Sequence, residues 1–321
     1  MLNWLLPLLR CPTCRGVMAG ELGDTAGRLI CDDCGRQVVV RGGIPRFVQG
    51  QSLGADDDTA RRTQASFGYE WTHFKDWRPS GATNFVDYFG QFDLDWLRGR
   101  TVLDGGCGMG RHARQLAPFA GKIVAVDFSG AIDQAARNVA DQGNVACVEG
   151  DLTRLPVADG QFDFVYSMGV LHHLDDTEGA LRGLVRALKP GGRLRLYLYW
   201  KRTGVSGALL SLVSLARIVT TRLPFPILKA FCWVLSLWLF ALVIVPYRLL
   251  AKCGASVSDA WPLFLYEKYP FNVLYNDQFD RFSAPLEKRY SEREVQALLE
   301  AVGLREVRVH ARYGWIGDGV K

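Results

Sequence analysis

The sequence predicts an α/β protein built on a parallel sheet, with a small cysteine-rich unit before the sheet and an apolar helical insertion within it. Two Cys-x-x-Cys pairs lie in the first 35 residues. Short β-branched runs then alternate with helical segments from 101 to 200, and the pattern resumes at 291 after a long apolar stretch. The 321 residues are enough for one domain with a sizeable core and additional units.

Composition and charge exclude several classes of protein. Hydrophobic residues make up 49% and charged residues 22%, which is typical of a globular chain and excludes disordered and fibrous ones. The 38 basic and 33 acidic residues leave a net charge of +5 with no concentrated basic patch, which argues against a dedicated nucleic-acid binder. The opening MLNWLLPLLR lacks a basic start, so we expect no secretory signal and a cytoplasmic location.

The first unit, residues 1–50, contains a candidate metal site. Its cysteines follow the spacing C-x2-C-x16-C-x2-C, and two tight turns of this kind can present four thiolates to one tetrahedral Zn²⁺. Four thiolates leave no open coordination position, so the zinc would be structural; the alternative is two redox or disulfide pairs. The predicted ligands are Cys11, Cys14, Cys31 and Cys34. Gly16 and Gly35 follow the pairs, where we expect positive φ.

This unit resembles the zinc ribbon of the small activator subunit of tRNA and protein methyltransferases. The resemblance is carried by LRCPTC, by CDDCG and by the closing GGIPRF, and it covers about the first fifty residues. It implies a zinc ribbon that ends near residue 50.

Residues 51–98 begin polar and then become densely aromatic. FGYEW, at 67–71, recurs in relatives that carry the same ribbon, which suggests a lid near a cofactor. The alternative is an aromatic core that packs the ribbon against the sheet. We treat 51–98 as a lid or linker segment.

The core, residues 99–200, shows five strand signals separated by helical segments, which predicts a parallel α/β sheet. The strand signals are TVLDG, KIVAVD, VACVEGD, FDFVYSM and RLRLYLY. At 291–321 the chain resumes with SEREVQALLEAVG, a helix capped by Ser291 and ended by Gly303, and then with the strand signal LREVRVH. This last segment is expected to complete the same sheet.

A glycine-rich turn follows the first core strand. An acidic residue, Asp104, ends the strand, and glycines then allow the backbone to approach a ligand while helix N–H groups point at it. The segment GMGRHA also fits a dinucleotide pattern. Asp127 ends the second strand, where a carboxylate can accept both ribose hydroxyls, and Asp151 follows the third, near an adenine amine. The dinucleotide interpretation leaves Asp104 and Asp151 without roles.

With these neighbours, the core resembles the class I S-adenosylmethionine-dependent methyltransferases, of the type 11 kind, which have a Rossmann-like sheet. The matching segments are DGGCGMGRHA, VAVDFS, GDLTRLPVADGQFDFVYSMGVLHHL and LKPGGRLRL, in order over about a hundred residues. The resemblance implies S-adenosylmethionine as the methyl donor. It also implies cofactor-binding roles for Asp104, Gly105, Gly106, Cys107, Gly108, Gly110, Asp127, Phe128, Asp151, Leu152, Ser167 and Met168.

Methyl transfer from a sulfonium needs alignment and exclusion of water, and a base only where the acceptor must lose a proton. His172 and His173 follow the fourth strand at the carboxyl edge of the sheet, where ligands of such sheets bind, so they are the candidate catalytic residues. They could instead only shape the pocket. His73 is a further candidate, and Asp175 and Asp176 are expected to cap the next helix.

The insertion, residues 201–290, is the most unusual stretch. Its segment 230–247 carries no charge over eighteen residues, the lower bound for a spanning helix, and Pro224 and Pro226 separate it from an earlier apolar stretch. A single crossing would place the last helix and strand on the wrong side of a membrane, and Arg217 argues against two full spans. We expect a hairpin entering one leaflet through residues 205–252, at the inner face of the membrane, or a helical lid. Residues 261–290, with Asp280, Arg281 and Tyr290, are expected to form the far wall of the pocket.

The sequence therefore favours methyl transfer to a small lipophilic acceptor such as a quinone, lipid, glycolipid or secondary metabolite. The first alternative is an RNA methyltransferase whose zinc ribbon holds RNA; few basic residues in the ribbon and the apolar insertion make nucleic acid an unfavoured partner. The second is a non-catalytic scaffold. Every cofactor motif is intact, which argues against this alternative.

Overall fold

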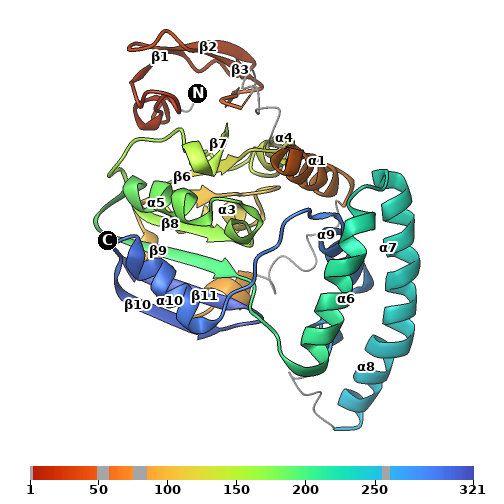
Figure 1. Cartoon of the computed structure of the whole chain (residues 1–321). Helices are drawn as coiled ribbons and strands as arrows, with labels where there is room; N and C mark the ends of the chain where they lie inside the picture. The colour runs from red at the N-terminus through yellow and green to blue at the C-terminus, as the bar shows by residue number, and fades with distance from the viewer. Residues whose placement is uncertain (1–2, 49–57, 75–84, 255–260) are drawn as a thin grey trace.

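The computed structural model describes residues 3–48, 58–74, 85–254 and 261–321. A small β-ribbon lies at one end of a central α/β sheet, and a group of long helices lies beside the sheet (Figure 1). The ribbon sheet has the order β1-β2-β3-β4, and the central sheet has seven strands.

The central sheet has the order β10-β11-β9-β8-β5-β6-β7. Its strands are β5 (Thr101–Gly105), β6 (Lys122–Asp127), β7 (Val145–Glu149), β8 (Phe162–Met168), β9 (Leu188–Leu198), β10 (Arg305–Ala311) and β11 (Trp315–Val320). The first five are parallel, and β11 pairs antiparallel with both β9 and β10. Because the chain runs outward from β5 to β7 and then returns to β8 on the other side of β5, the topological switch point lies between β5 and β8. Open α/β sheets bind ligands at this point.

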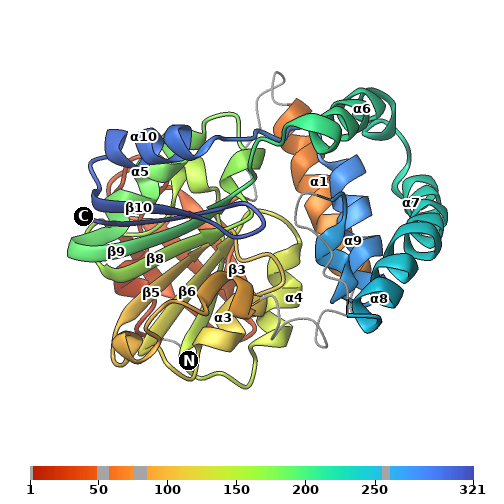
Figure 2. The ribbon, with the colours of Figure 1, turned by 90° about the horizontal axis from the view of Figure 1, so that it is seen from below.

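Helices cover both faces of this sheet, as Figure 2 shows from a second direction. They are α3 (Arg111–Leu116), α4 (Ala131–Asn138), α5 (Thr177–Ala187) and α10 (Glu292–Ala301). Apolar side chains of α5 and α10 pack in one core cluster, and those of α3 and α4 pack in the other. Of the two aspartates expected to cap α5, Asp176 is the N-cap and accepts a hydrogen bond from the N–H of Gly179, whereas Asp175 is not the cap. The predicted cap Ser291 is confirmed and forms a capping box with Glu294.

The ribbon lies against the outer edge of the sheet beside β7. It contains η1 (Leu6–Leu8), β1 (Met18–Glu21), β2 (Ala26–Cys31), β3 (Gln37–Arg41) and β4 (Ile44–Pro45). The N–H of Phe47 donates to the carbonyl of Glu149 at 2.9 Å, and the guanidinium of buried Arg46 pairs with Glu149 and Asp133. The ribbon thus covers an edge strand that would otherwise leave backbone groups unpaired.

The insertion folds into a helical hairpin. It consists of α6 (Gly204–Thr220), α7 (Phe225–Leu239), a π-helical turn (Phe240–Ile244) and α8 (Val245–Lys252). The bend between α6 and α7 lies at the two prolines, as predicted: Pro224 is the N-cap of α7, and Pro226 is in its first turn. Helices α1 (Asp58–His73) and α9 (Phe271–Ser283) lie between the hairpin and the sheet (Figure 2). Four short helical turns, η2 (Asp95–Leu97), η3 (Leu152–Arg154), η4 (Leu171–His173) and η6 (Phe264–Glu267), complete the described elements.

The predicted fold class is confirmed: a Rossmann-like α/β sheet with a cysteine cluster and an apolar helical insertion. Among the described residues, Phe225–Lys252 is the one helix long and apolar enough to cross a membrane, and 22% of its most apolar window is buried. Arg217 faces inward, because its Nε donates to the carbonyl of Arg281 at 2.7 Å and its guanidinium pairs with Glu287. Strand β11, with its two glycines, is an element that the sequence pattern did not indicate.

Candidate functional site

The glycine-rich turn after β5 is shaped by positive φ angles and close packing. Gly106, Gly108 and Gly110 have φ of 83°, 53° and 76°, which side chains rarely adopt. A Cβ on Gly106 would lie 2.4 Å from a methyl carbon of Val170, so no larger residue fits there. The turn is anchored to the next strand, since the N–H of Gly108 donates to Asp127 Oδ2 at 2.8 Å. The backbone is therefore held open toward the carboxyl edge of the sheet.

Asp104 lies beneath this turn and outside the wall of the cavity described below. It is 2% exposed, and Tyr166 donates its hydroxyl to Asp104 Oδ2 at 2.7 Å. Burial raises the pKa of the Asp104 carboxyl to about 7, partly offset by the Tyr166 hydrogen bond. Asp104 therefore supports the turn from below, and its direct contact with a cofactor stays a prediction.

The other predicted cofactor residues divide into two groups. Gly106, Cys107, Gly108, Asp127, Phe128, Asp151, Leu152 and Met168 line one large cavity, whereas Asp104, Gly105, Gly110 and Ser167 lie behind its wall. Ser167 donates to the carbonyl of Gly105 at 2.8 Å and so fixes the end of β5. Asp151 caps η3 by accepting the N–H of Thr153 at 2.8 Å.

Asp127 retains capacity to accept further hydrogen bonds. Its Oδ2 takes the N–H of Gly108, and its Oδ1 takes the N–H and the hydroxyl of Ser129. A carboxylate offers about four lone-pair directions, so Oδ2 can still accept from a ligand hydroxyl. Burial raises the pKa of Asp127, which the hydrogen bonds from Ser129 and Gly108 oppose.

The cavity extends from the glycine turn to the helical hairpin and has a volume of about 1420 Å³. Its cofactor-side wall comes from the ends of β5, β6 and β8, and its opposite wall comes from α1, α9 and the hairpin. Trp71 of α1 covers the turn, because a Cβ on Gly108 would lie 3.3 Å from Trp71 Nε1. On the hairpin side the cavity is lined by apolar residues that include Leu209, Leu212, Val213, Leu235, Leu239 and Val243.

The two predicted catalytic histidines lie in different environments. His173 lines the cavity, and its Nδ1 contacts the carbonyl of Leu286 at 2.7 Å. This contact requires a donor on Nδ1, so the neutral ring has its lone pair on Nε2. His172 lies outside the wall, is fully buried, and neither ring nitrogen has a partner among the described residues. Burial lowers the pKa of His172 well below its usual value, and the neighbouring His173 lowers it further. Of the pair, only His173 has access to a ligand.

The sequence did not indicate a cluster of carboxylates on α1 and α9. Glu70, Asp277 and Asp280 all line the cavity, and Arg281 lies beside them. Burial raises the pKa of Glu70 well above its usual value, and nearby Asp280 adds to this effect. Of the residues predicted to form the far wall, Asp280 and Arg281 line the cavity and Tyr290 does not.

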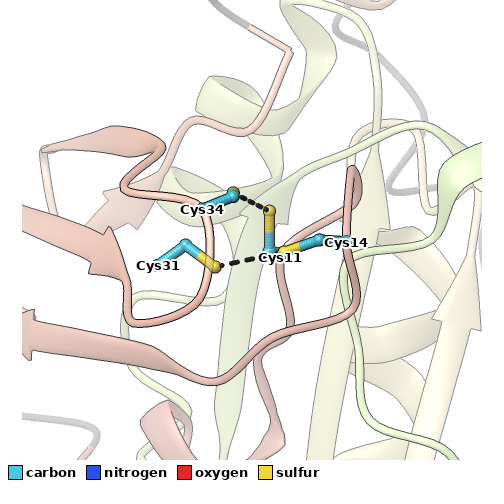
Figure 3. Close-up of side chains that lie close together, drawn as sticks. All are labelled: Cys11, Cys14, Cys31 and Cys34. Carbon is cyan, nitrogen blue, oxygen red and sulfur yellow. Dashed lines mark hydrogen bonds between the residues drawn. The ribbon is translucent and has the colours of Figure 1, made fainter.

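The four predicted metal ligands come together in the ribbon (Figure 3). All four sulfurs lie within 4.8 Å of one another; Cys11 and Cys34 are 3.7 Å apart, and Cys14 and Cys31 are 3.4 Å apart. Sulfurs about 2.3 Å from one tetrahedral zinc would be roughly 3.8 Å apart, so the cluster fits this ion. Backbone N–H groups of Gly16 and Arg36 also point at sulfurs of Cys14 and Cys34. This set of residues could hold a metal.

The expected positive φ is found at Gly35, with φ of 70°, but not at Gly16. In the first turn Arg15 adopts φ of 68° instead. Gly16 is required for a different reason, because a Cβ there would lie 2.8 Å from Cys31 Sγ and 2.5 Å from Asp33 Oδ2. The expectation of a positive φ at Gly16 was therefore wrong, and it is close packing that requires a glycine at this position.

Residues 103–196 match the family model described as "Methyltransferase domain". The matched segment runs from β5 to β9 and contains the glycine turn and the ends of β6 and β8. The chain therefore carries a methyltransferase domain over these residues.

The chain is also similar to curated methyltransferases over this part of its length. It is 34% identical over 104 residues to sterol 24-C-methyltransferase of Aspergillus fumigatus, covering 31% of this chain and 28% of the relative. It is 36% identical over 104 residues to the ubiquinone/menaquinone biosynthesis C-methyltransferase of Klebsiella pneumoniae, covering 30% and 41%. An O-methyltransferase of Aspergillus sclerotiorum is 34% identical over 103 residues, covering 30% and 39%. The chain thus spans less than half the length of these relatives.

Proposed function

We propose that this protein transfers the methyl group of S-adenosylmethionine to a small lipophilic acceptor. One observation carries the proposal: a single cavity joins the glycine turn and Asp127 to the apolar side chains of the hairpin. An acceptor with an apolar body can therefore lie along the hairpin with its reacting atom toward the cofactor edge. The relatives named for sterol and quinone substrates support an acceptor of this kind.

The residues of the turn fit the donor. The glycine turn after Gly106 would face its methionine part, Asp127 would accept from the ribose, and Asp151 with Leu152 would border the adenine. When bound, the donor supplies a methyl group on a positively charged sulfur. The protein then contributes alignment and exclusion of water, and Trp71 and Phe67 of α1 close the cavity over the turn.

The test uses S-adenosylmethionine with a labelled methyl group, incubated with the full chain and whole-cell extract. Organic-soluble, aqueous, RNA and protein fractions are then separated and counted. Label is expected in the organic fraction, and it should be absent with the Gly106→Val variant, whose side chain would collide with Val170. Label in RNA would instead support the nucleic-acid alternative. A chain that does not bind the donor at all would support the scaffold alternative.

We further propose that Cys11, Cys14, Cys31 and Cys34 hold a structural Zn²⁺. The mutual distances of the sulfurs and the N–H groups aimed at them support this assignment. The ribbon has a small core, and an ion of this kind would fix the two turns. The first of them carries Arg15, whose guanidinium donates to the carbonyls of Leu155 and Val157.

The hairpin is proposed to lie on the inner face of a membrane, within one leaflet. Its outer side is apolar and exposed: Trp238 is 61% exposed and Leu242 66%. Residues 204–254 contain five basic residues and no acidic one, which suits an anionic leaflet. The cavity wall includes Leu209, Leu212 and Phe231 from these same helices, so an acceptor could enter from lipid.

Flotation with vesicles of phosphatidylglycerol and phosphatidylcholine tests this contact. The wild-type chain should float with the vesicles, and the double variant Trp238→Glu with Leu242→Glu should stay in the soluble fraction. Val39→Glu, at a position 51% exposed on the ribbon, is the matched control and should float. A wild-type chain that remains soluble would contradict membrane contact.

A further inference from the structure

Two carboxylates from different helices line the cavity near one another, since Glu70 is bonded to Asn276, one helical turn before Asp280. Each has an oxygen without a partner among the described residues. Glu70 of α1 is 1% exposed; its Oε1 accepts from Asn276 Nδ2 at 3.0 Å, while its Oε2 is buried and has no partner among the described residues. Asp280 of α9 accepts the Tyr199 hydroxyl on Oδ2 at 3.3 Å, and its Oδ1 is likewise buried and unpartnered in the described part of the chain. Buried polar atoms without partners are rare and costly.

Two neighbouring buried carboxylates do not both carry a charge easily. Burial, and then the nearby Asp280, raise the free energy of the ionised form of Glu70, and two close carboxylates commonly share one proton. The charged and titratable groups around Glu70 are Asp280 and Asp277 from α9 and Arg111 from α3. Tyr199, the residue after β9, donates its hydroxyl to Asp280. Arg281 of α9 acts electrostatically on Asp277, which also accepts the Tyr266 hydroxyl at 2.7 Å. The cluster thus holds three carboxyl groups, those of Glu70, Asp277 and Asp280, against the two guanidinium groups of Arg111 and Arg281, so acidic groups are in excess.

The pair borders the cofactor half of the cavity. Glu70 precedes Trp71, which covers Gly108, and Arg111 is the first residue of α3 after the glycine turn. Arg111 acts electrostatically on both Glu70 and Asp104. The pair therefore lies between the turn and the apolar wall of the hairpin, where the reacting atom of an acceptor would be.

We propose that Glu70, paired with Asp280, takes the proton from a hydroxyl group of the acceptor, which is therefore an amphiphile with a hydroxyl at its reacting end. The inference rests on the proposed function. In the step, the acceptor oxygen forms a bond to the methyl carbon while the bond from that carbon to sulfur breaks and its electron pair stays on sulfur. The hydroxyl proton passes to the Glu70 carboxylate, so atoms and charge balance. His173 supplies the alternative base, because of the adjacent pair His172 and His173 it alone lines the cavity, with its Nε2 free of the contact to Leu286.

The experiment compares Glu70→Gln, Asp280→Asn and His173→Gln in the full chain, with exposed Glu292→Gln as the control. Transfer of a carbon-13 methyl label into a chloroform–methanol extract of whole cells is followed, and the NMR shift of the labelled carbon reports whether it is bound to oxygen. Glu70→Gln should lower the rate about 100-fold or more and leave the affinity for S-adenosylhomocysteine within about twofold. The wild-type rate should fall as the pH drops and the Glu70 carboxylate, whose pKa is raised by burial, becomes protonated. This acid limb should disappear in Glu70→Gln.

Infrared spectroscopy provides a readout that needs no acceptor. The Asp104→Asn background removes the carbonyl band of the Asp104 carboxyl, which is also partly protonated at neutral pH. In that background the shared proton should give the carbonyl band of a protonated carboxylic acid at neutral pH, and the band should weaken when Glu70→Gln is added. Three results would overturn this inference and leave the proposed function standing. They are methyl transfer by Glu70→Gln at the wild-type rate, a labelled methyl bound to carbon, and a loss of activity in His173→Gln only. Binding of S-adenosylhomocysteine by the wild type with no label in any fraction would overturn the proposed function and this inference together.

Discussion

The buried carboxyl group of Asp104 shows how one residue can oppose stability while it shapes a site. Its side chain lies under the glycine turn with Tyr166 as its hydrogen-bond partner. Because burial raises its pKa to about 7, the folded protein keeps the proton to a higher pH than the unfolded chain does. The folded state therefore loses stability as the pH rises from about 4 to about 7.

Asp104→Asn should consequently be more stable than the wild type at pH 8, by up to about 4 kcal/mol. The amide oxygen can still accept from Tyr166, and no buried charge remains. The advantage should shrink as the pH falls from 7 toward 4, where both proteins are neutral at this position. Denaturant unfolding across this pH range measures the effect. A difference that does not change with pH would show that the charge of Asp104 is not its cause.

At the residue scale, the sequence predicted the positions at the ends of the parallel strands better than those brought together by long-range contacts. Asp127 and Asp151 follow strands, so their place at one edge of the sheet could be inferred from pattern alone. Glu70 and Asp280 are more than two hundred residues apart, and their meeting depends on the packing of α1 on α9. His172 and His173 are adjacent in sequence, yet the tight turn of η4 leaves only one of them facing the cavity.

The ribbon is the element whose stability depends most on a bound ion. Replacing buried Cys31 by Ser should reduce the zinc content from about one ion per chain to near zero, because three thiolates and a hydroxyl bind zinc more weakly. Elemental analysis of the purified chain measures this. Cys253→Ser, which removes an exposed thiol outside the cluster, should retain the ion. Absence of zinc together with fewer free thiols after denaturation would support the disulfide alternative.

Arg46 is the main ionic link between the ribbon and the sheet. Its side chain is 2% exposed and pairs with Glu149, whose side chain is 9% exposed. Arg46→Ala should lower the free energy of unfolding by about 3–5 kcal/mol, because it leaves a buried carboxylate without a counter-charge. Exposed Arg41 on the same ribbon provides the matched control, and Arg41→Ala should change the free energy of unfolding by less than about 1 kcal/mol. Equal losses of unfolding free energy in Arg46→Ala and Arg41→Ala would show that the buried Glu149 carboxylate does not need Arg46 as its counter-charge.

At the element scale, periodicity predicted the parallel strands and their capped helices, and it missed β11. The two glycines of WIGDGV weaken its strand pattern, although the structure requires them. A Cβ on Gly317 would lie 2.8 Å from Leu299, and one on Gly319 would lie 3.0 Å from Leu304. The reason for these glycines is the close approach of α10 and its following loop, which a single sequence does not reveal.

Binding of the cofactor should stabilise the whole molecule. S-adenosylhomocysteine at 100 times its Kd should raise the free energy of unfolding by about 2.7 kcal/mol, since it binds only the folded chain. Thermal unfolding with and without the ligand measures the shift in Tm. Asp127→Ala should abolish the shift, whereas Asp95→Ala, which removes a surface ion pair with Arg98, should keep it. An unchanged shift in Asp127→Ala would remove Asp127 from the proposed site.

At the scale of the whole molecule, the sequence predicted the order of the units and left open how the insertion is placed. Composition alone could not distinguish a lid from a membrane hairpin, because both need apolar helices. The structure shows one side of the hairpin packed on α9 and the other exposed. The packed face therefore covers the cavity as a lid, and the exposed apolar face is the one that the proposed membrane contact would use.

The π-helical turn at Phe240–Ile244 determines which face of the long helix is inward. The buried side chains of this helix, Leu228, Cys232, Ser236 and Ile244, are spaced by fours and eights. In an uninterrupted α-helix, sixteen residues rotate the side-chain direction by about 160°, so Leu228 and Ile244 would point to nearly opposite sides. The wider turn takes up most of that rotation. The π-helical turn therefore changes the direction in which side chains point, so that buried residues before and after it lie on the same side of the helix. Deletion of one residue at 240–244 would turn Ile244 and Tyr247 away from their partners in η6 and α9.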